Sequence, residues 1–513
     1  MNENYETHLS YLTVGTSGQT ESQAEYILPD YLSDMRKLLY YSVELYPASS
    51  YKTEEGSEHS GIVTYNVLYL DEEGELSSVS FSSDYDLSVG GGEATGESAL
   101  AELQASSVRI AGPRKLIGKA SVCVGALRLR EVLSESVIEE RDDAEVASRV
   151  LNSADLITTE ETEREYAEPF ISIEGAIKDE VSTPLYSASV CVSGIDTRDG
   201  AVNLKGHILV RALVRNDEEA PYPRELKIPI DEELAVENIP DGATVFPRTN
   251  VSSVTLSVNQ SESGVNIVAS VIATYGIVAV SNKAVEVVTD AYLKSRPSSS
   301  EYGESNYHSL RHASFTLDPV AFEVPRTELG GESLQDIILA SANTKIDSTI
   351  DSDGNLIHSG EIKISGVYTE LSDDGRAVYQ PMKLNFPYEK KIMEHMSDRD
   401  LLRSSVRAHA STTDVSFDHE TVFFNLVLEV ETLVTESKTE RVLRSLTARE
   451  GEEYARSSSE ITVYYPDPDE TLFSVARRFH TTPKKLALDN LLDVSVSADP
   501  TSSLVGTKKL LIF

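Results

Sequence analysis

The chain has 513 residues, of which 40% are hydrophobic, and its formal net charge at pH 7 is −39. The apolar share is enough for ordinary cores, which excludes a disordered chain, and the length suggests three to four domains. The negative charge would repel a phosphate backbone, and the sequence has no basic face that would bind nucleic acid.

Cysteine usage and the N-terminus indicate a reducing compartment. Cys123 and Cys191 lie in the similar segments ASVCV and ASVCVSG, where buried thiols are small hydrophobic side chains and not a disulfide framework. The N-terminal MNENYETHLSYLTVG lacks the basic start and apolar run of a secretion signal, and no stretch approaches the roughly eighteen apolar residues of a membrane span. We therefore expect a cytoplasmic protein without a membrane span.

One unit occurs three times, and its pattern predicts a β-meander. The copies begin near Glu54, Asp199 and Asp351, and each contains alternating segments such as IVTYNVLYL, HILVRALV and IKISGVYTEL. Alternation of this kind is typical of antiparallel strands with one buried face. Three glycines open the middle strand of the copies at a domain-sized spacing: Gly61, Gly206 and Gly360. We therefore predict a tandem array of homologous modules.

The turns of the repeat are acidic and end in glycine. Asp199-Gly200 and Asp353-Gly354 suit tight turns, because glycine accepts a positive φ and aspartate tolerates it. A calcium loop around Gly354 is excluded by spacing, since its first and last ligands would be Thr349 and Gly360.

Each meander is followed by a second half rich in β-branched residues, which predicts further strands. The segment DAEVASRVLNSADLI, residues 143–157, has a helical appearance, and SRPSSSEYGESN, from Ser295, has the composition of a linker. The chain is therefore divided as follows: β-rich modules at 1–145, 146–296 and 307–450, linkers at 297–306 and 451–459, and a small domain at 460–513.

The small C-terminal domain differs from the modules. Its sequence predicts the order strand, helix, helix, strand, with a core-facing helical stripe of Leu472, Val475, Ala476 and Phe479. Thr482 and Pro483 form a typical cap and first turn for the second helix.

This domain resembles a LysM module. The segment 468–473, PDETLF, corresponds to the LysM signature PGDTLW, Asn490 to the asparagine that ends the second helix, and Gly506–Ile512 to the closing GxxLxIP. Asp469 replaces the usual glycine and Phe473 the usual tryptophan. The resemblance implies a small α+β domain with the order βααβ.

The three modules resemble the SPOCS repeat of sporulation proteins. The entry LPDYLSDMRKLLYYS is similar to the family's VPDxKPDIxRIL, and ELKIPI is similar to its exit. Tandem SPOCS repeats with a C-terminal LysM domain are the architecture of spore coat morphogenetic proteins of the SipL type. In that family the LysM module is an adaptor for the ATPase that polymerises as the basement layer of the coat on the forespore surface.

No catalytic motif is present: the sequence lacks GxSxG, a P-loop, HExxH and paired CxxC. His308 and His312 would share one face of a helix but have no acidic third ligand at a suitable spacing. We interpret one polar cluster as a turn or a solvated strand edge: Asp414, Asp418, His419 and Glu420. We expect no enzyme activity, no cofactor and no metal.

The resemblance therefore implies a mainly β, non-enzymatic scaffold of the mother-cell cytoplasm. Its modules would bind coat proteins, and its LysM domain would bind the basement ATPase. The alternative is a wall protein that binds the N-acetylglucosamine chains of peptidoglycan through the same loops. For either ligand, the expected contact residues lie in the two loops that flank the helices: Asp469, Glu470, Thr471, Phe473, Asn490, Leu491 and Leu504. Phe473 is either a core residue or an exposed contact.

Overall fold

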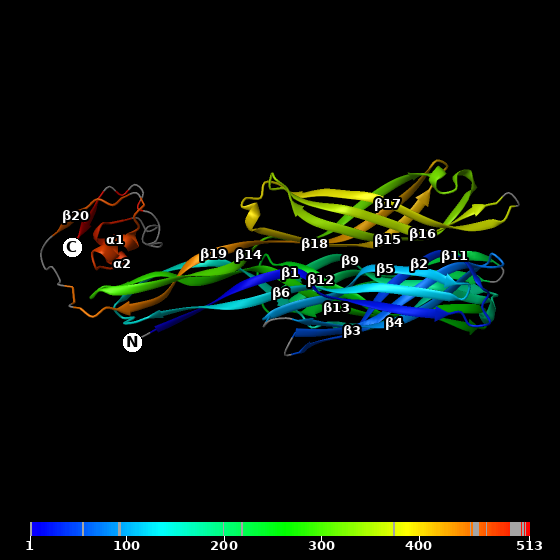
Figure 1. Ribbon diagram of the computed structural model, residues 1–513, viewed down its shortest axis with the longest axis horizontal. Coiled ribbons are helices and arrows are strands. Elements are labelled where there is room, and N and C mark those ends of the chain that lie inside the picture. Colours follow the sequence, from blue (N-terminus) through cyan, green and yellow to red (C-terminus); the bar gives the residue numbers. More distant parts are fainter. Residues whose placement is uncertain are drawn as a thin grey trace.

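The computed structural model describes residues 3–53, 56–90, 94–198, 200–216, 219–372, 375–451, 453–454, 461–467, 469–492, 504, 507 and 509–513. The described chain is mainly β, as predicted, with two short α-helices. Figure 1 shows an elongated molecule in which β-sandwiches gather at one end and long strands run to a small helical unit at the other.

The first repeat is a sandwich of two three-stranded layers. The central strand of one layer is the long β6, which pairs with β1 and β5, and the other layer is the meander β2-β3-β4. The strands are β1 (Glu3–Ile27), β2 (Met35–Thr53), β3 (Gly56–Asp71), β4 (Leu76–Gly90), β5 (Gly96–Gly112) and β6 (Lys115–Ile138).

The second repeat has the same connectivity, except that its first strand is divided into β7 and β8, which both pair with β13. The meander is β9-β10-β11, and β12 lies on the other side of β13. The elements are β7 (Ala144–Thr158), β8 (Thr162–Glu174), a 3₁₀ turn (Lys178–Glu180), β9 (Val181–Arg198), β10 (Ala201–Asn216), β11 (Glu219–Ala235), β12 (Thr244–Ser261) and β13 (Gly264–Leu293).

In the third repeat β14 and β18 flank β19, and the meander is β15-β16-β17. A short parallel pairing of β19 with β6, at Ser445–Val137, joins this layer to that of the first repeat. The elements are β14 (Ser298–Pro325), 3₁₀ turns (Arg326–Glu328, Gly331–Ser333 and Arg399–Leu401), β15 (Leu334–Ile350), β16 (Leu356–Leu371), β17 (Ala377–Met393), β18 (Leu402–Phe417) and β19 (Thr421–Ala448).

Two predictions about the connections are wrong. The segment 143–157 is not a helix but β7, whose pairing with β13 outweighs its local helical propensity. Residues 298–306 are not a linker, because β14 begins at Ser298 and pairs with β19 from there. Backbone pairing needs no apolar side chains, so a serine-rich segment can form a strand beside a stable neighbour. The second predicted linker, 451–459, lies mostly outside the described residues.

Each sandwich has its own apolar core between the two layers. In the first repeat Tyr65 is fully buried and stacks on Phe81, with ring centroids 5.0 Å apart. The core of the third repeat stacks Phe322 on Phe386 at 4.1 Å. The alternation read from the sequence fits these cores, since every second side chain of a meander strand points between the layers.

The glycines shared by the meanders lie inside the middle strand and do not open it. A Cβ atom at Gly206 would lie 2.0 Å from the carbonyl oxygen of Cys191, and one at Gly360 would lie 2.0 Å from that of Lys345. In the first repeat, a Cβ at Gly61 would lie 2.5 Å from a backbone carbonyl oxygen. Only glycine allows two strands to approach so closely, which explains why this residue recurs in each copy.

Beyond the sandwiches the long strands form three ribbons, which we call the stalk: residues 3–15 with 126–138, 144–157 with 279–293, and 298–312 with 434–448. All three ribbons contribute to one buried cluster: Leu9, Leu151, Val287, Tyr307 and Val442. Buried serines link the ribbons as well, since the Ser10 amide donates to Ser153 Oγ at 2.9 Å and the hydroxyls of Ser134 and Ser305 lie 3.1 Å apart. The repeats are therefore packed together along their length.

The close approach at Gly206 predicts a large loss of stability for Gly206→Ala. The new methyl group would force β9 and β10 apart, and we expect a loss of about 3 kcal/mol in the free energy of unfolding, measured by urea titration. Gly194→Ala is the matched control, because a Cβ atom there has no neighbour within 4 Å. An equal loss in both variants would contradict this explanation.

Candidate functional site

The C-terminal unit has the element order that its sequence predicts. Two short strands, β20 (Thr462–Tyr464) and β21 (Leu510–Ile512), form an antiparallel pair. The helices α1 (Leu472–Arg478) and α2 (Pro483–Asp489) lie between these strands in the chain. The predicted stripe of Leu472, Val475 and Ala476 is buried, and Phe479 is partly buried against it.

Most residues predicted to contact a partner or glycan hold this unit together instead. Thr471 caps α1 by accepting a hydrogen bond from the Ser474 amide at 3.0 Å. Glu470 accepts hydrogen bonds from the Tyr464 hydroxyl at 2.7 Å and pairs with Arg478 at 2.9 Å. The role of Thr471 follows from helix-end chemistry, in which free amide groups need acceptors.

The second loop is used in a similar way. The side chain of Asn490 donates to the carbonyl oxygens of Leu486 and Leu511, at 2.9 and 2.8 Å, and so joins α2 to β21. Leu504 is buried in the core of the unit. Of the predicted contact residues, Asp469 and Leu491 are exposed, the latter by 93%, whereas Phe473 and Leu504 are buried. Contact of these loops with a partner or a glycan stays a prediction.

Phe473 is buried, and its main contact lies outside the unit. Its ring meets that of Tyr292, on β13, edge to face at a centroid distance of 5.0 Å. The Tyr292 hydroxyl donates to the Thr481 carbonyl oxygen at 2.6 Å. Burial raises the pKa of Tyr292, which keeps this phenol protonated as the donor. Phe473 and Thr481 thus fasten the unit to the stalk.

An ion pair strengthens this contact. Arg477 of α1 donates to both carboxylate oxygens of Asp290, at 2.9 and 3.0 Å, and the Tyr302 hydroxyl donates to the same carboxylate at 2.6 Å. His480 adds a ring stack on Tyr454 at 3.5 Å. Figure 1 shows the unit beside the free ends of the stalk ribbons. The side of the unit formed by α1 and Thr481 is therefore covered by the chain itself.

Large apolar side chains are exposed on β20 and at its two ends. Ile461, Val463 and Tyr465 occupy alternate positions of this extended segment, so their side chains share one face, while Thr462 is also exposed and Tyr464 is half-buried. Their exposed fractions are 62% for Ile461, 48% for Val463 and 69% for Tyr465, and Phe513 at the end of β21 is 55% exposed. Such a concentration of exposed apolar residues is typical of an interaction surface.

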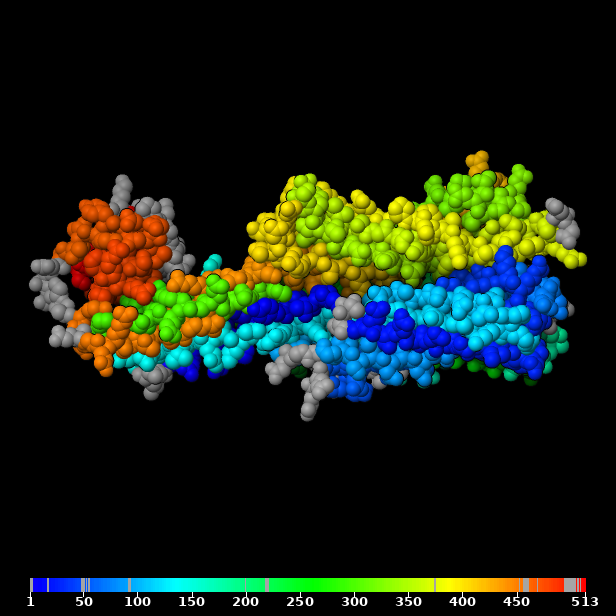
Figure 2. Space-filling view, in the orientation of Figure 1, coloured from blue at the N-terminus to red at the C-terminus, as the bar shows by residue number. Residues whose placement is uncertain are grey.

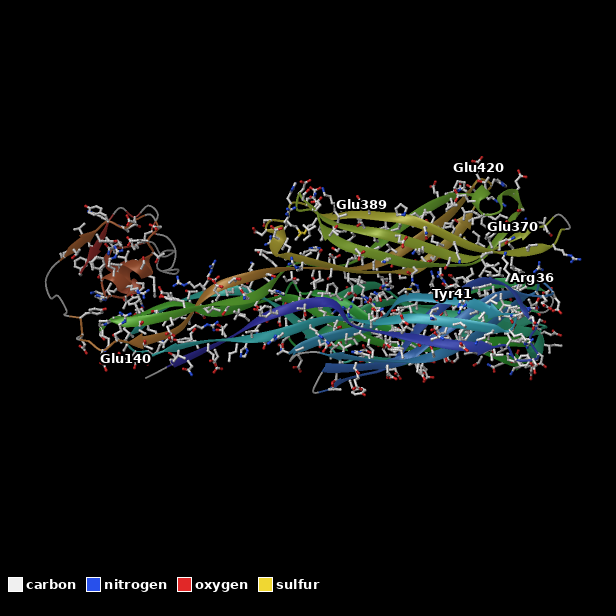
Figure 3. All side chains as sticks on the ribbon, viewed as in Figure 1. Arg36, Tyr41, Glu140, Glu370, Glu389 and Glu420 are labelled. Atoms are coloured by element: carbon white, nitrogen blue, oxygen red, sulfur yellow. The ribbon has the colours of Figure 1, made fainter. Side chains whose placement is uncertain are left out.

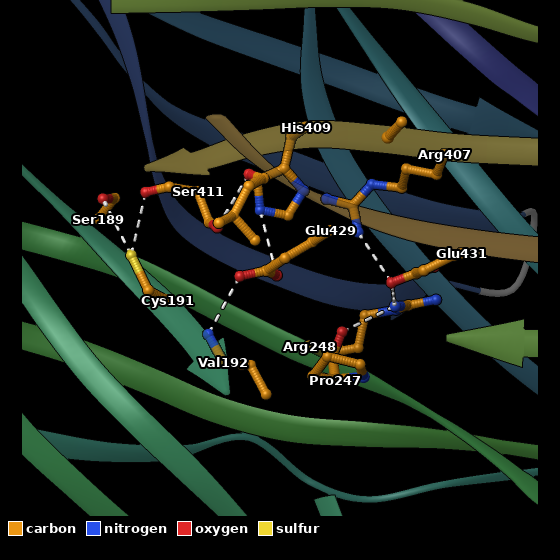
Figure 4. A network of polar contacts seen from close by, with 12 residues as sticks. Ser189, Cys191, Val192, Pro247, Arg248, Arg407, His409, Ser411, Glu429 and Glu431 are labelled. Atoms are coloured by element: carbon orange, nitrogen blue, oxygen red, sulfur yellow. Dashed lines mark hydrogen bonds and ion pairs between the residues drawn. The ribbon is translucent and has the colours of Figure 1, made fainter. Parts of the chain in front are cut away.

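A chain of alternating charges joins the three repeats at the sandwich end of the molecule. Glu431 of β19 lies 2.6 Å from the guanidinium of Arg248 in the second repeat and 3.3 Å from that of Arg407 in its own. Arg407 also pairs with Glu102 of the first repeat. The arginines converge on the carboxylate of Glu431 in Figure 4, where both side chains of the Glu431–Arg248 pair are almost buried.

A second buried carboxylate on β19 contacts the second repeat. Glu429 accepts a hydrogen bond from the Val192 amide at 3.0 Å and lies 3.3 Å from His409 Nε2 (Figure 4). Next to it the Cys191 thiol donates to the Ser411 carbonyl oxygen at 3.1 Å. Burial raises the pKa of this thiol to about 11, so it remains protonated and acts as a hydrogen-bond donor.

The histidine pair lies on a strand and not on a helix. His308 Nδ1 lies 2.7 Å from the Leu12 carbonyl oxygen, and His312 Nε2 lies 3.2 Å from Ser314 Oγ. Within the described ranges, no group of three or more histidine, cysteine, aspartate or glutamate residues is placed to hold a metal ion. The predicted turn or solvated strand edge is confirmed: Asp414 is an exposed residue of β18, and Asp418 accepts the amides of Glu420 and Thr421 at 2.8 Å in the turn that follows.

Several residues at these contacts were not identified from the sequence: Arg248, Asp290, Tyr292, Arg407, Glu431 and Arg477. One signal could have found two of them. The strand β12 pairs with β13, and β18 pairs with β19, and each pairing has one shift of register. Arg248 and Arg407 precede these two shifts by the same number of residues. An alignment of the repeats would have put both arginines at one position.

No family model, no curated protein and no solved structure matches the chain. None of the helices in the described part is long and apolar enough to cross a membrane.

The charge chain predicts that Glu431→Gln destabilises the array. The change leaves Arg248 and Arg407 without their shared carboxylate, and removing one member of a buried ion pair costs about 3 kcal/mol or more. Glu225→Gln is the control, since the Arg211–Glu225 pair is more exposed and should cost less than about 1 kcal/mol. Urea titrations of both variants should differ accordingly, and equal midpoints would count against a role for Glu431 in joining the repeats.

The contact between the C-terminal unit and the stalk predicts that Arg477→Gln loosens it. Spin labels at the exposed positions Ser474 and Val150 should give one narrow distance distribution in the parent chain and a broad one in the variant. Arg478→Gln is the matched control, because Arg478 pairs with Glu470 inside the unit. A narrow distribution in all three chains would show that the ion pair with Asp290 does not hold the unit.

Proposed function

We propose that this chain is a non-enzymatic scaffold in the assembly of the bacterial spore coat. Its three SPOCS-like repeats hold coat proteins, and its LysM-like C-terminal unit docks to the ATPase of the coat basement layer on the forespore surface, in the mother-cell cytoplasm. The proposal rests on the resemblance of the repeats and of residues 468–512 to these families.

The observation that carries the adaptor role is the exposed apolar side of the C-terminal unit. Its α1 side is fixed to the stalk through Phe473 and Arg477, whereas Ile461, Val463 and Tyr465 remain exposed. A unit held in this way presents one defined surface at the end of a long body, which suits docking to another protein.

Charge supports the same assignment. Residues 461–513 contain six acidic and six basic side chains, so the net negative charge belongs to the rest of the chain. An electrically neutral unit at the end of an acidic body approaches a partner without the repulsion that the body imposes on acidic surfaces.

The packed repeats support the scaffold role. The largely buried Glu431–Arg248 pair, the more exposed Glu102–Arg407 pair and the shared stalk core hold three similar sandwiches at fixed positions. Several weak binding surfaces at fixed distances gain from effective concentration, because each bound client segment raises the local concentration of the next.

The test is binding of the full chain to two baits, the purified basement ATPase and purified peptidoglycan. We expect binding to the ATPase, and at least a tenfold weaker interaction for Val463→Glu, since a carboxylate in the apolar surface would be buried in the complex. Val150→Glu is the control, because Val150 is 64% exposed on the stalk, away from this surface.

Binding to peptidoglycan without binding to the ATPase would replace the proposal with a wall-binding function. If Val463→Glu leaves binding to the ATPase unchanged, the adaptor role would stand, but the binding surface would not be the apolar residues around β20.

A further inference from the structure

The three repeats line a half-open cavity of about 2030 Å³ between their sandwiches. Protein interiors are close-packed, and ligand pockets rarely exceed about 1,000 Å³, so this space is larger than a small-molecule site. Figure 2 shows the third repeat lying along the first, and Figure 3 shows Tyr41 of β2, a residue of the cavity wall, on the side of the first repeat that faces the third.

Strand edges form the walls of this cavity. A strand that turned one surface to the cavity would contribute every second residue to the wall. Four strands instead contribute consecutive residues, at Leu38–Leu45 of β2, Leu100–Ser106 of β5, Ile337–Asp347 of β15 and Ser405–Ala410 of β18. In the described part of the chain each of these strands pairs with a neighbour on one side only, so its other edge has no strand partner. At that edge the described residues of β15 and β18 contact each other only through side chains, which occupy two of their carbonyl oxygens.

Side-chain hydrogen bonds show which backbone groups belong to these free edges. Thr344 donates to the Ala408 carbonyl oxygen, and Ser404 donates to that of Ser348 at 3.2 Å. In an antiparallel strand the amide and the carbonyl of one residue point to the same side. The even-numbered residues of β18 from Leu402 to Ala410 therefore direct both groups away from β19 and toward the free edge.

The charged groups of the cavity wall balance one another. Its lining contains seven carboxylate side chains and seven lysine or arginine side chains, although the whole chain carries −39. Several are already paired within the wall, as in Glu102–Arg407, Arg248–Glu431 and Arg211–Glu225. An occupant of this cavity therefore needs no charge of its own, and apolar side chains from β2, β5, β15 and β18 complete the wall.

We propose that this cavity binds an extended polypeptide segment of low net charge, which adds as a strand to the free edges of the repeats. Added strands gain affinity from backbone hydrogen bonds, and the alternating pockets beside them give specificity. The eleven wall residues of β15 span roughly 36 Å, which matches a segment of about ten residues. The inference deepens the proposed function, since the segment belongs to a client of the scaffold, but it does not involve the C-terminal unit.

The probe is a phage-displayed library of linear twelve-residue peptides, selected on the full immobilised chain. We expect enrichment of sequences with alternating apolar residues and a net charge near zero. A synthetic copy of an enriched peptide then gives dissociation constants for the parent chain and for its variants by fluorescence anisotropy.

Two glycines in the wall allow the cavity to be filled without backbone strain. A Cβ atom at Gly125 would meet no atom closer than 3.8 Å, and one at Gly15 would meet none within 4 Å. Gly125→Trp and Gly15→Trp should therefore fold and weaken peptide binding at least tenfold. Gly112→Trp is the matched control, because Gly112 has equal space but lies outside the wall.

No enrichment on the parent chain would overturn the proposal. So would a peptide that binds both wall variants as tightly as the parent while their melting temperatures are unchanged. ATPase binding by the C-terminal unit is measured on the same variants and should not change, so a failure of this inference is distinguishable from a failure of the proposed function.

Discussion

The arrangement of the three repeats depends on one carboxylate. Glu431 receives an arginine from its own repeat and one from the second, and Arg407 extends the chain of charges to Glu102 of the first. Removing these groups from water is costly, and their attraction offsets that cost only if every member is present with good geometry. The contact therefore specifies how the repeats meet more than it adds stability, because any other packing would leave a buried charge without a partner. This matters in a chain with a net charge of −39, in which general electrostatics push the repeats apart.

The same assembly gives the stalk its position. Each long strand belongs to a sandwich at one end and to a ribbon at the other, so the sandwiches cannot move without shifting the ribbons. The buried cluster around Leu9, Leu151 and Tyr307 joins the ribbons, and Tyr292 and Asp290 near their free ends receive the C-terminal unit. The orientation of that unit is thus coupled, through continuous β-strands, to the packing of repeats that lie far from it.

The sequence contained most of the local structure and little of the contact between repeats. Alternation predicted the meanders, and Thr482 and Pro483 predicted the start of the second helix, because these signals act over a few residues. The segment 143–157 was misread because its pairing with β13 comes from residues that lie more than a hundred positions away. Glu431 and Arg248 are as distant in sequence, and nothing near either one indicates the other. Phe473 illustrates the same limit, since part of its buried environment is Tyr292 of the second repeat, which is distant in sequence.

Burial of Phe473 also changes how the C-terminal unit would recognise a partner. A partner that bound through Phe473 or the side of α1 that faces the stalk would first have to break the contacts of Phe473, Arg477 and Thr481 with the stalk. Recognition through the outer side of β20 requires no such step, because Val463 and Tyr465 are already exposed. The energetic difference favours the outer side as the first point of contact. The side formed by α1 and Thr481 serves a different purpose, which is to hold the unit at a fixed angle to the body.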